Sequence, residues 1–174
     1  TLWHTLSLHD ALPIWDDGWN FKGMGQFGFS LSPTDTLVVA AGRSGSADTR
    51  DAVLGKLRSL SPNSAFSHVR AVALALEAQP TREACAVLER LLRDEGIRGG
   101  SRLTLRDAVD RCLPGRVEDS ERNRQLKEIL TARALWACGD PNGLAREVLE
   151  AYAKGLQGHY ARHARAILAK PPGA

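Results

Sequence analysis

Two amphipathic helices joined by a short turn, over residues 122–156, constrain the fold of this chain more than any other stretch. In the first helix, apolar residues recur every four positions and so share one face: Leu126, Leu130, Ala134 and Cys138. The Gly-Asp-Pro-Asn-Gly that follows predicts a helix end at Gly139, a cap at Asp140 and a new helix with Pro141 in its first turn. That second helix has its own apolar face, formed by Leu144, Val148, Tyr152 and Leu156. Helices joined this closely lie antiparallel and bury their apolar faces against each other.

The same pattern predicts further helix pairs upstream. Three such units follow one another in the chain: residues 33–60 turning near Gly45, residues 66–94 turning at Pro80, and residues 122–156 turning at Pro141. A last helix over residues 158–169 closes the series, and residues 171–174 form a short tail. Because such pairs cannot bury their apolar faces alone, we expect an all-α domain over residues 32–170 built of stacked antiparallel pairs, an α-α superhelix.

The first of these units has a clear helix start. Ser32 is placed to cap the helix, Pro33 fits its first position, and Asp35 favours its positive end. An alternative makes residues 37–41 a strand and residues 42–45 a phosphate-binding loop. The cap, the alanines and the lack of a second convincing strand favour the helix.

An irregular insert separates the last two units, over residues 97–120. It contains a Gly-Gly loop, a short helix capped by Thr104 and stopped at Pro114, and an acidic linker. The apolar residues of the short helix are expected to point inward: Leu105, Ala108, Val109 and Cys112.

Composition agrees with one globular domain without a membrane span. The chain has 174 residues, of which 43% are hydrophobic and 25% charged, and its net charge is +3. No segment approaches the roughly 20 apolar residues of a transmembrane helix, so we expect a soluble protein, although no compartment is indicated. The cysteines (Cys85, Cys112 and Cys138) lie far apart without paired spacing, which predicts buried free thiols.

The segment over residues 15–31 has neither helical nor strand periodicity and is rich in glycine and aromatic residues. Gly23, Gly25 and Gly28 spell G-x-G-x-x-G, but no buried strand precedes them and the next helix begins only near residue 32. We therefore expect an ordered loop that binds no nucleotide. Its aromatic side chains pack on the helices or face a domain further upstream: Trp15, Trp19, Phe21 and Phe27.

The first fourteen residues need a separate interpretation. Residues 5–14, TLSLHDALPI, resemble the conceptual translation of a common sequencing adapter joined to a genuine reading frame. We therefore exclude residues 1–14 from the fold, as one excludes a cloning scar. This interpretation also predicts that the natural protein continues upstream of Trp15, so that the chain is a fragment.

Two resemblances extend these expectations. Residues 134–141, ALWACGDP, resemble the helix end and Gly-Asp-Pro turn of HEAT-like repeats. The runs WDDGWNFKGMGQFG, FSHVRAVALALE and GHYARHARAIL resemble the helical C-terminal region of bacterial FAD-dependent oxidoreductases. That resemblance implies a parent enzyme that binds FAD elsewhere, because the flavin-binding motif is not in this sequence and no catalytic residue carries over.

The sequence contains no constellation typical of a catalytic, cofactor-binding or metal-binding site. His159 and His163 are four residues apart on a helix, but Arg162 and Arg165 beside them would repel a cation. With Lys170, these four residues form a basic stripe that suits phosphates or an acidic partner. We treat His159, Arg162, His163 and Arg165, together with the aromatic residues of the segment 15–31, as a candidate interaction surface. His68 is expected to be hydrogen-bonded in the first turn of its helix.

The sequence thus favours a non-catalytic accessory domain that contacts the upstream catalytic domain of a flavoenzyme. The alternative is a free-standing HEAT-like scaffold that binds another protein. A helical repeat that binds nucleic acid is the least favoured, since it requires arginines gathered on one surface.

Overall fold

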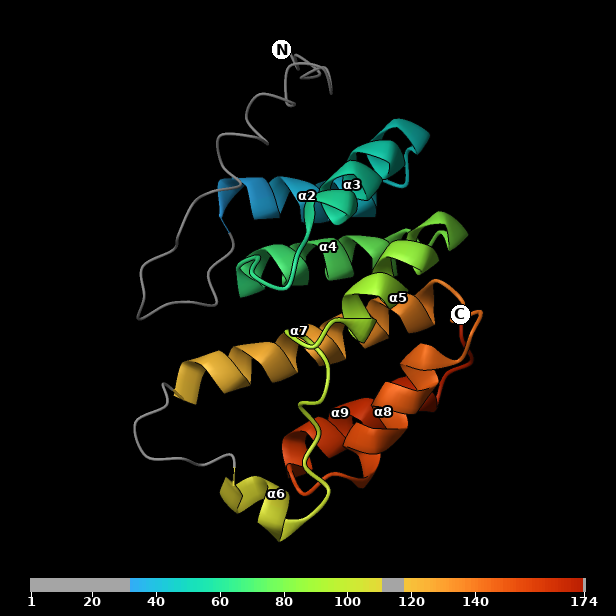
Figure 1. Cartoon of the computed structure of the whole chain (residues 1–174). Helices are drawn as coiled ribbons and strands as arrows, with labels where there is room; N and C mark the ends of the chain where they lie inside the picture. Colours follow the sequence, from blue (N-terminus) through green and yellow to red (C-terminus); the bar gives the residue numbers. More distant parts are fainter. Residues whose placement is uncertain (1–31, 111–117, 174) are drawn as a thin grey trace.

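The computed structural model describes residues 32–110 and 118–173, which form α-helices and connecting loops with no β-strand among them (Figure 1). The predicted all-α class is therefore confirmed. Residues 37–41, for which a strand was the alternative, lie within the first described helix, α2 (Pro33–Ser44). The segment 15–31 and Cys112 lie outside the described residues.

The helices form two rows. Figure 1 shows one row stacked with the N-terminal ends on the same side, formed by α2, α4 (Phe66–Ala78) and α7 (Glu118–Ala137). The second row is formed by α3 (Ala47–Ser59), α5 (Cys85–Arg93, after a 3-10 turn at Arg82–Ala84) and α8 (Leu144–Lys154). The remaining helices are the short α6 (Leu105–Asp110) and the last helix, α9 (Gly158–Leu168), which packs on α8.

The start of α2 follows from its sequence. Ser32 Oγ accepts a hydrogen bond from the Asp35 backbone N–H at 3.0 Å, and Asp35 Oδ2 accepts one from the Ser32 N–H at 2.9 Å. Pro33 occupies the first turn, where its missing N–H has no partner to lose. This reciprocal capping box satisfies donors that a helix end otherwise leaves unpaired.

Helices α2 and α4 approach each other closely at Gly42. A Cβ atom placed on Gly42 would lie 2.4 Å from Ala75 Cα, so no larger residue fits without moving one helix. Around this crossing Val38, Ala71 and Val72 are buried. Small residues at the crossing therefore bring two apolar faces into direct contact.

Helix α7 is the centre of the fold, because it packs against α4, α5 and α8. Ala134 and Cys138 of the predicted stripe are buried, whereas Leu126 and Leu130 are half-buried and pack against the core. Ile129, beside this stripe, and Leu135, outside it, are also buried. A helix with neighbours on several sides buries more than one face.

The turn between α7 and α8 differs from the prediction. Helix α7 ends at Ala137 and α8 begins only at Leu144, with Gly143 rather than Asp140 as its N-cap. The Asp140 carboxylate nevertheless accepts the backbone N–H groups of Ala145 and Arg146, each at 2.9 Å. The carboxylate reaches over the turn, so it caps the helix without occupying the N-cap position.

The insert between α5 and α7 contains α6, whose start is capped by Thr104 and Asp107 in reciprocal bonds of 3.1 Å. The Thr104 cap is therefore confirmed. The predicted inward orientation of Leu105 is wrong, because this residue is 76% exposed.

The predicted place of Leu156 on the apolar face of α8 is also wrong. The residue follows the end of α8 and is 51% exposed. Its backbone N–H bonds to Arg102 O, and this turn takes Leu156 off the helical face.

Candidate functional site

A groove of about 360 Å³ lies between α7 and α9. Its apolar lining consists of Trp136, Ala137, Ala166, Ile167 and Pro171, and its polar lining consists of Glu77, Arg133, His163 and Lys170. This volume is at the lower end of the range for pockets that hold a small ligand. The groove therefore suits a bulky side chain or a small molecule with both apolar and polar parts.

The tail that follows α9 closes one end of this groove. Trp136 Nε1 donates to the Lys170 carbonyl at 3.1 Å, and the Gly173 N–H donates to the Trp136 carbonyl at 2.9 Å. The indole N–H is thus engaged, and Trp136 is only 6% exposed. Its ring, with the Arg146 guanidinium 5.4 Å from the centroid, contributes a fixed aromatic wall.

Arg133 joins three elements at the polar side of the groove. Its guanidinium forms an ion pair with Glu77 of α4, and its Nη1 lies 3.4 Å from His163 Nε2 of α9. A guanidinium only donates, so Nε2 accepts and His163 is in its neutral form in this arrangement. Burial and the nearby Arg133 charge both lower the pKa of His163, which agrees with a neutral ring.

Glu77 leaves one acceptor unused at the same place. Its Oε2 pairs with Arg133, whereas its Oε1 is buried and has no hydrogen-bond partner among the described residues. A buried acceptor without a donor is unfavourable. Glu77 Oε1 is therefore an unsatisfied acceptor inside the protein rather than one that the open groove presents.

Two residues of the predicted basic stripe, His163 and Lys170, line the groove, and Arg162 is exposed next to His163 on α9. Arg165 donates to the Ala153 carbonyl of α8 at 2.7 Å. The exposed His159 ring lies against Tyr160, with 4.0 Å between the two ring centroids. The other predicted surface residues lie outside the described part of the chain: Trp15, Trp19, Phe21 and Phe27.

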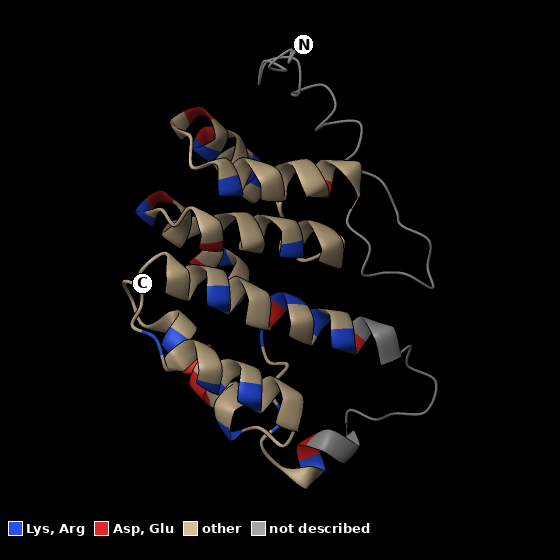
Figure 2. Cartoon of the chain, turned by 180° about the vertical axis from the view of Figure 1, so that it is seen from behind, with Lys and Arg blue, Asp and Glu red and all other residues tan. Residues whose placement is uncertain are grey.

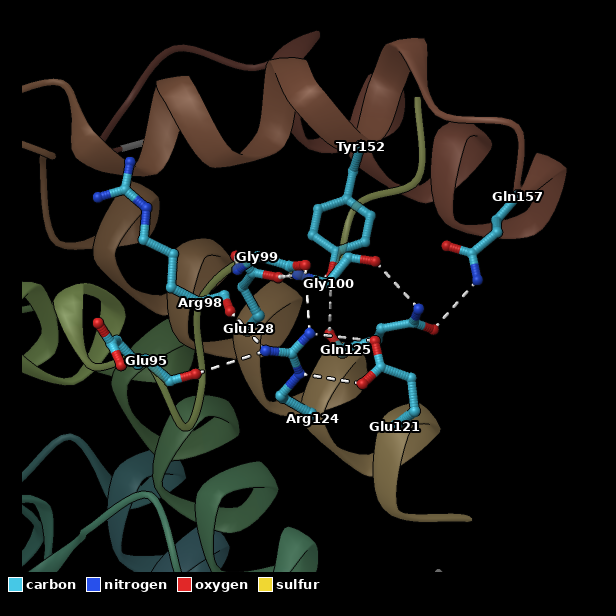
Figure 3. A network of polar contacts seen from close by, with 10 residues as sticks. All are labelled: Glu95, Arg98, Gly99, Gly100, Glu121, Arg124, Gln125, Glu128, Tyr152 and Gln157. Atoms are coloured by element: carbon cyan, nitrogen blue, oxygen red, sulfur yellow. Dashed lines mark hydrogen bonds and ion pairs between the residues drawn. The ribbon is translucent and has the colours of Figure 1, made fainter. Parts of the chain in front are cut away.

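A second polar cluster, shown in Figure 3, surrounds the Gly99–Gly100 loop. Glu128, only 3% exposed, accepts the N–H groups of Gly99 and Gly100 at 2.8 and 2.7 Å and the Tyr152 hydroxyl at 2.7 Å. Burial and the Glu128 charge raise the pKa of Tyr152, so its hydroxyl stays protonated and donates. Gln125 Nε2 completes the contact by donating to the Gly100 carbonyl at 3.0 Å.

Arg124 holds the other side of the same loop. It donates to the carbonyl oxygens of Arg98 and Gly99 at 2.9 and 3.3 Å and pairs with Glu121 (Figure 3). A Cβ atom on Gly100 would lie 2.5 Å from the Tyr152 hydroxyl oxygen, so the loop backbone fills the space between α7 and α8. These polar groups therefore bind the protein's own backbone. Sequence periodicity missed them because it identifies faces and not contact partners.

A buried histidine–carboxylate pair links α2 to α4. His68 Nδ1 lies 2.7 Å from Asp35 Oδ1, and Asp35 is completely buried. Burial raises the pKa of Asp35, but the hydrogen bonds from His68 and from Ser32 outweigh it, and the net shift is downward. The predicted hydrogen-bonded role of His68 is thus confirmed, with a partner that already caps α2.

The described thiols fit the predicted buried free cysteines. Cys85 and Cys138 are buried and unpaired with each other, and the Cys85 thiol donates to the Cys138 carbonyl at 3.4 Å. Burial raises the pKa of Cys138 to about 11, so this thiol carries no charge at neutral pH.

Among the described residues, no group of His, Cys, Asp or Glu side chains is placed to hold a metal. None of the described helices is long and apolar enough to cross a membrane.

Comparisons of the chain with protein-family models, with curated proteins and with solved structures find no match.

Proposed function

We propose that this chain is a non-catalytic helical domain whose groove between α7 and α9 contacts another protein segment. The groove carries this proposal, because it combines an apolar wall with a cationic rim on the surface of a well-packed helical fold. The buried polar groups elsewhere, such as Asp35 and Glu128, bind helix ends and loop backbone. Their contacts support a structural role for them and leave the groove as the place for recognition.

The nature of the larger assembly rests on the sequence resemblances. We propose that the segment contacted is the catalytic part of an FAD-dependent oxidoreductase of which this domain forms the C-terminal region, with FAD bound outside this chain. The two rows of helices support a HEAT-like stack, because α2, α4 and α7 follow one another in the same direction (Figure 1). In such stacks, successive helix pairs present an extended surface to a partner.

The test begins with the genomic DNA upstream of the codon for Trp15. A flavoenzyme parent requires a strand, a G-x-G-x-x-G turn and a helix in that reading frame, followed by an acidic residue. The extended protein is then produced with a photo-crosslinking amino acid at Ala166 in the groove, and a matched variant carries it at Ala40 of α2. Both alanines are exposed helical residues, but Ala40 does not line the groove.

We expect the Ala166 probe, and not the Ala40 probe, to crosslink to the upstream part of the same polypeptide. Equal crosslinking from both positions, or none from Ala166, would contradict a docking role for the groove. An upstream frame that encodes only further helix pairs, with crosslinks from Ala166 to a separate protein, would favour the free-standing scaffold instead. The exposed Leu103, Leu105 and Leu156 favour this second candidate, since they leave further apolar surface for a partner.

A further inference from the structure

We propose that the groove between α7 and α9 binds an acidic peptide segment that inserts one apolar side chain beside Trp136. This inference rests on the proposed docking function and specifies the chemistry of the segment that is bound. The charge and the apolar lining of the groove support this proposal.

The charge around the groove is positive. Glu77 is the only acidic residue lining it, and the ion pair with Arg133 compensates its charge. Lys170 and the flanking Arg162 are exposed, and residues 158–173 contain no Asp or Glu. Figure 2 shows basic residues along α9, whereas α7 carries both basic and acidic residues. An acidic segment is therefore attracted to this edge, and a basic one is repelled.

The apolar wall defines the anchor. Trp136, held by the bond from its N–H to the Lys170 carbonyl and only 6% exposed, forms the buried base of the wall, and Ala166 and Ile167 line the groove from α9. A volume of about 360 Å³ has room for one leucine or phenylalanine side chain. A single buried apolar anchor surrounded by charged groups is the usual arrangement of a protein-binding hot spot.

The lining favours a peptide over a nucleic acid. Its apolar residues suit an apolar side chain, and Arg133 is already paired with Glu77, which leaves Lys170 and the flanking Arg162 as the cations for a ligand. Binding of a phosphate backbone draws on several cations along its path. The lining therefore matches a short acidic peptide with one apolar anchor better than a phosphate backbone.

The binding test uses three short synthetic peptides with a fluorescent label and the full chain. The first has Asp and Glu residues around a central phenylalanine, the second replaces this phenylalanine by serine, and the third replaces the acidic residues by lysines. Fluorescence anisotropy gives the Kd of each at low and at high salt. We expect the first peptide to bind at least about tenfold more tightly than either of the others, as loss of an anchor predicts.

Variants locate the binding. Ala166→Trp fills the groove and should weaken binding of the first peptide about tenfold or more, whereas Ala40→Trp, at an exposed helical alanine of α2, should leave it unchanged. Lys170→Glu should weaken the first peptide and strengthen the lysine peptide. Lys170 is exposed beyond α9, so Lys170→Glu should leave the fold intact. The switch in preference from the acidic to the lysine peptide therefore tests the proposal even if Ala166→Trp does not fold.

Equal binding of the three peptides, no effect of Lys170→Glu, or tighter binding of single-stranded RNA than of the first peptide would overturn the proposal. Its failure is distinguishable from failure of the docking function. If the Ala166 probe crosslinks to the upstream polypeptide but acidic peptides do not bind, the groove docks a segment of different chemistry. If neither occurs, the groove is not a docking site.

Discussion

Replacing Glu128 by glutamine tests the hydrogen bonds that hold the Gly99–Gly100 loop against α7 and α8. The carboxylate accepts the Gly99 N–H on Oε1, and the Gly100 N–H and the Tyr152 hydroxyl on Oε2. Glutamine has the same shape, but one of its terminal atoms is an NH₂ group that cannot accept. With the amide oxygen at the Oε2 position, the Gly99 N–H loses its partner; in the opposite orientation the Gly100 N–H loses its partner, and the Tyr152 hydroxyl accepts from the NH₂ group instead of donating.

The magnitude follows from these three contacts. Gly99 is exposed and its bond to Glu128 is only part-buried, so its loss costs about 1 kcal/mol, the low end of the range for a buried group, and each of the two retained bonds weakens by about 1 kcal/mol when the acceptor loses its charge. We therefore expect Glu128→Gln to lower the free energy of unfolding by about 3 kcal/mol. Tyr152→Phe removes one of the three bonds and should cost about 1–2 kcal/mol. The loss in the double variant should be smaller than the sum, because Glu128→Gln weakens the same bond that Tyr152→Phe removes.

Chemical denaturation followed by far-ultraviolet circular dichroism measures all three variants against the unchanged protein. The native helical spectrum of each variant is checked first. A loss below about 0.5 kcal/mol for Glu128→Gln would refute the reasoning, since a change of that size is typical of an exposed surface residue. Strict additivity of the two single changes would show that Glu128 and Tyr152 do not share a hydrogen bond.

Three further predictions follow from packing and ionisation. Gly42→Ala should destabilise the protein by about 1–3 kcal/mol, because its Cβ would meet Ala75. The control Gly55→Ala, in a helix with nothing near the new Cβ, should stabilise the protein by about 0.5–1 kcal/mol. If thermal denaturation gives a change in stability of the same sign for both variants, the close contact at Gly42 is contradicted. The pKa of His163 in the folded protein lies below its usual 6.5, so the unfolded chain binds the proton more readily and the free energy of unfolding falls as the pH drops below about 6.5. His163→Gln should remove this decline from unfolding curves recorded between neutral pH and about pH 5. An unchanged decline in the variant would contradict the prediction. The pKa of Asp35 in the folded protein lies below 3.8, so its contribution to the free energy of unfolding is present above that pH and is lost as the pH falls through the folded value. Asp35→Asn should lower the free energy of unfolding by about 2–4 kcal/mol at neutral pH. A decrease near zero would show that the buried pair with His68 is dispensable.

Local features of the sequence determined the helical class and several element boundaries. The capping residues Ser32 and Asp35 act within one helical turn, so neighbours in sequence suffice to predict the start of α2. The last helix, predicted over residues 158–169, is found as α9 (Gly158–Leu168), since helical spacing of apolar residues is also a local pattern. Helix α4 is apolar on nearly all sides, which is typical of a buried helix, and it packs against α2 and α7.

The tertiary structure alone decided which polar residues meet. Glu128 and Tyr152 are 24 residues apart, and Glu77 and Arg133 are 56 apart, so their pairing depends on how α4, α7 and α8 pack. The spacing of residues along one helix gives the direction of a side chain but not the identity of the residue opposite. For this reason His163 was named from the sequence only as part of a basic stripe, whereas its place in a groove with Trp136 and Arg133 came from the fold. The helices are thus set by short-range hydrogen bonding and apolar periodicity, and the groove by long-range packing.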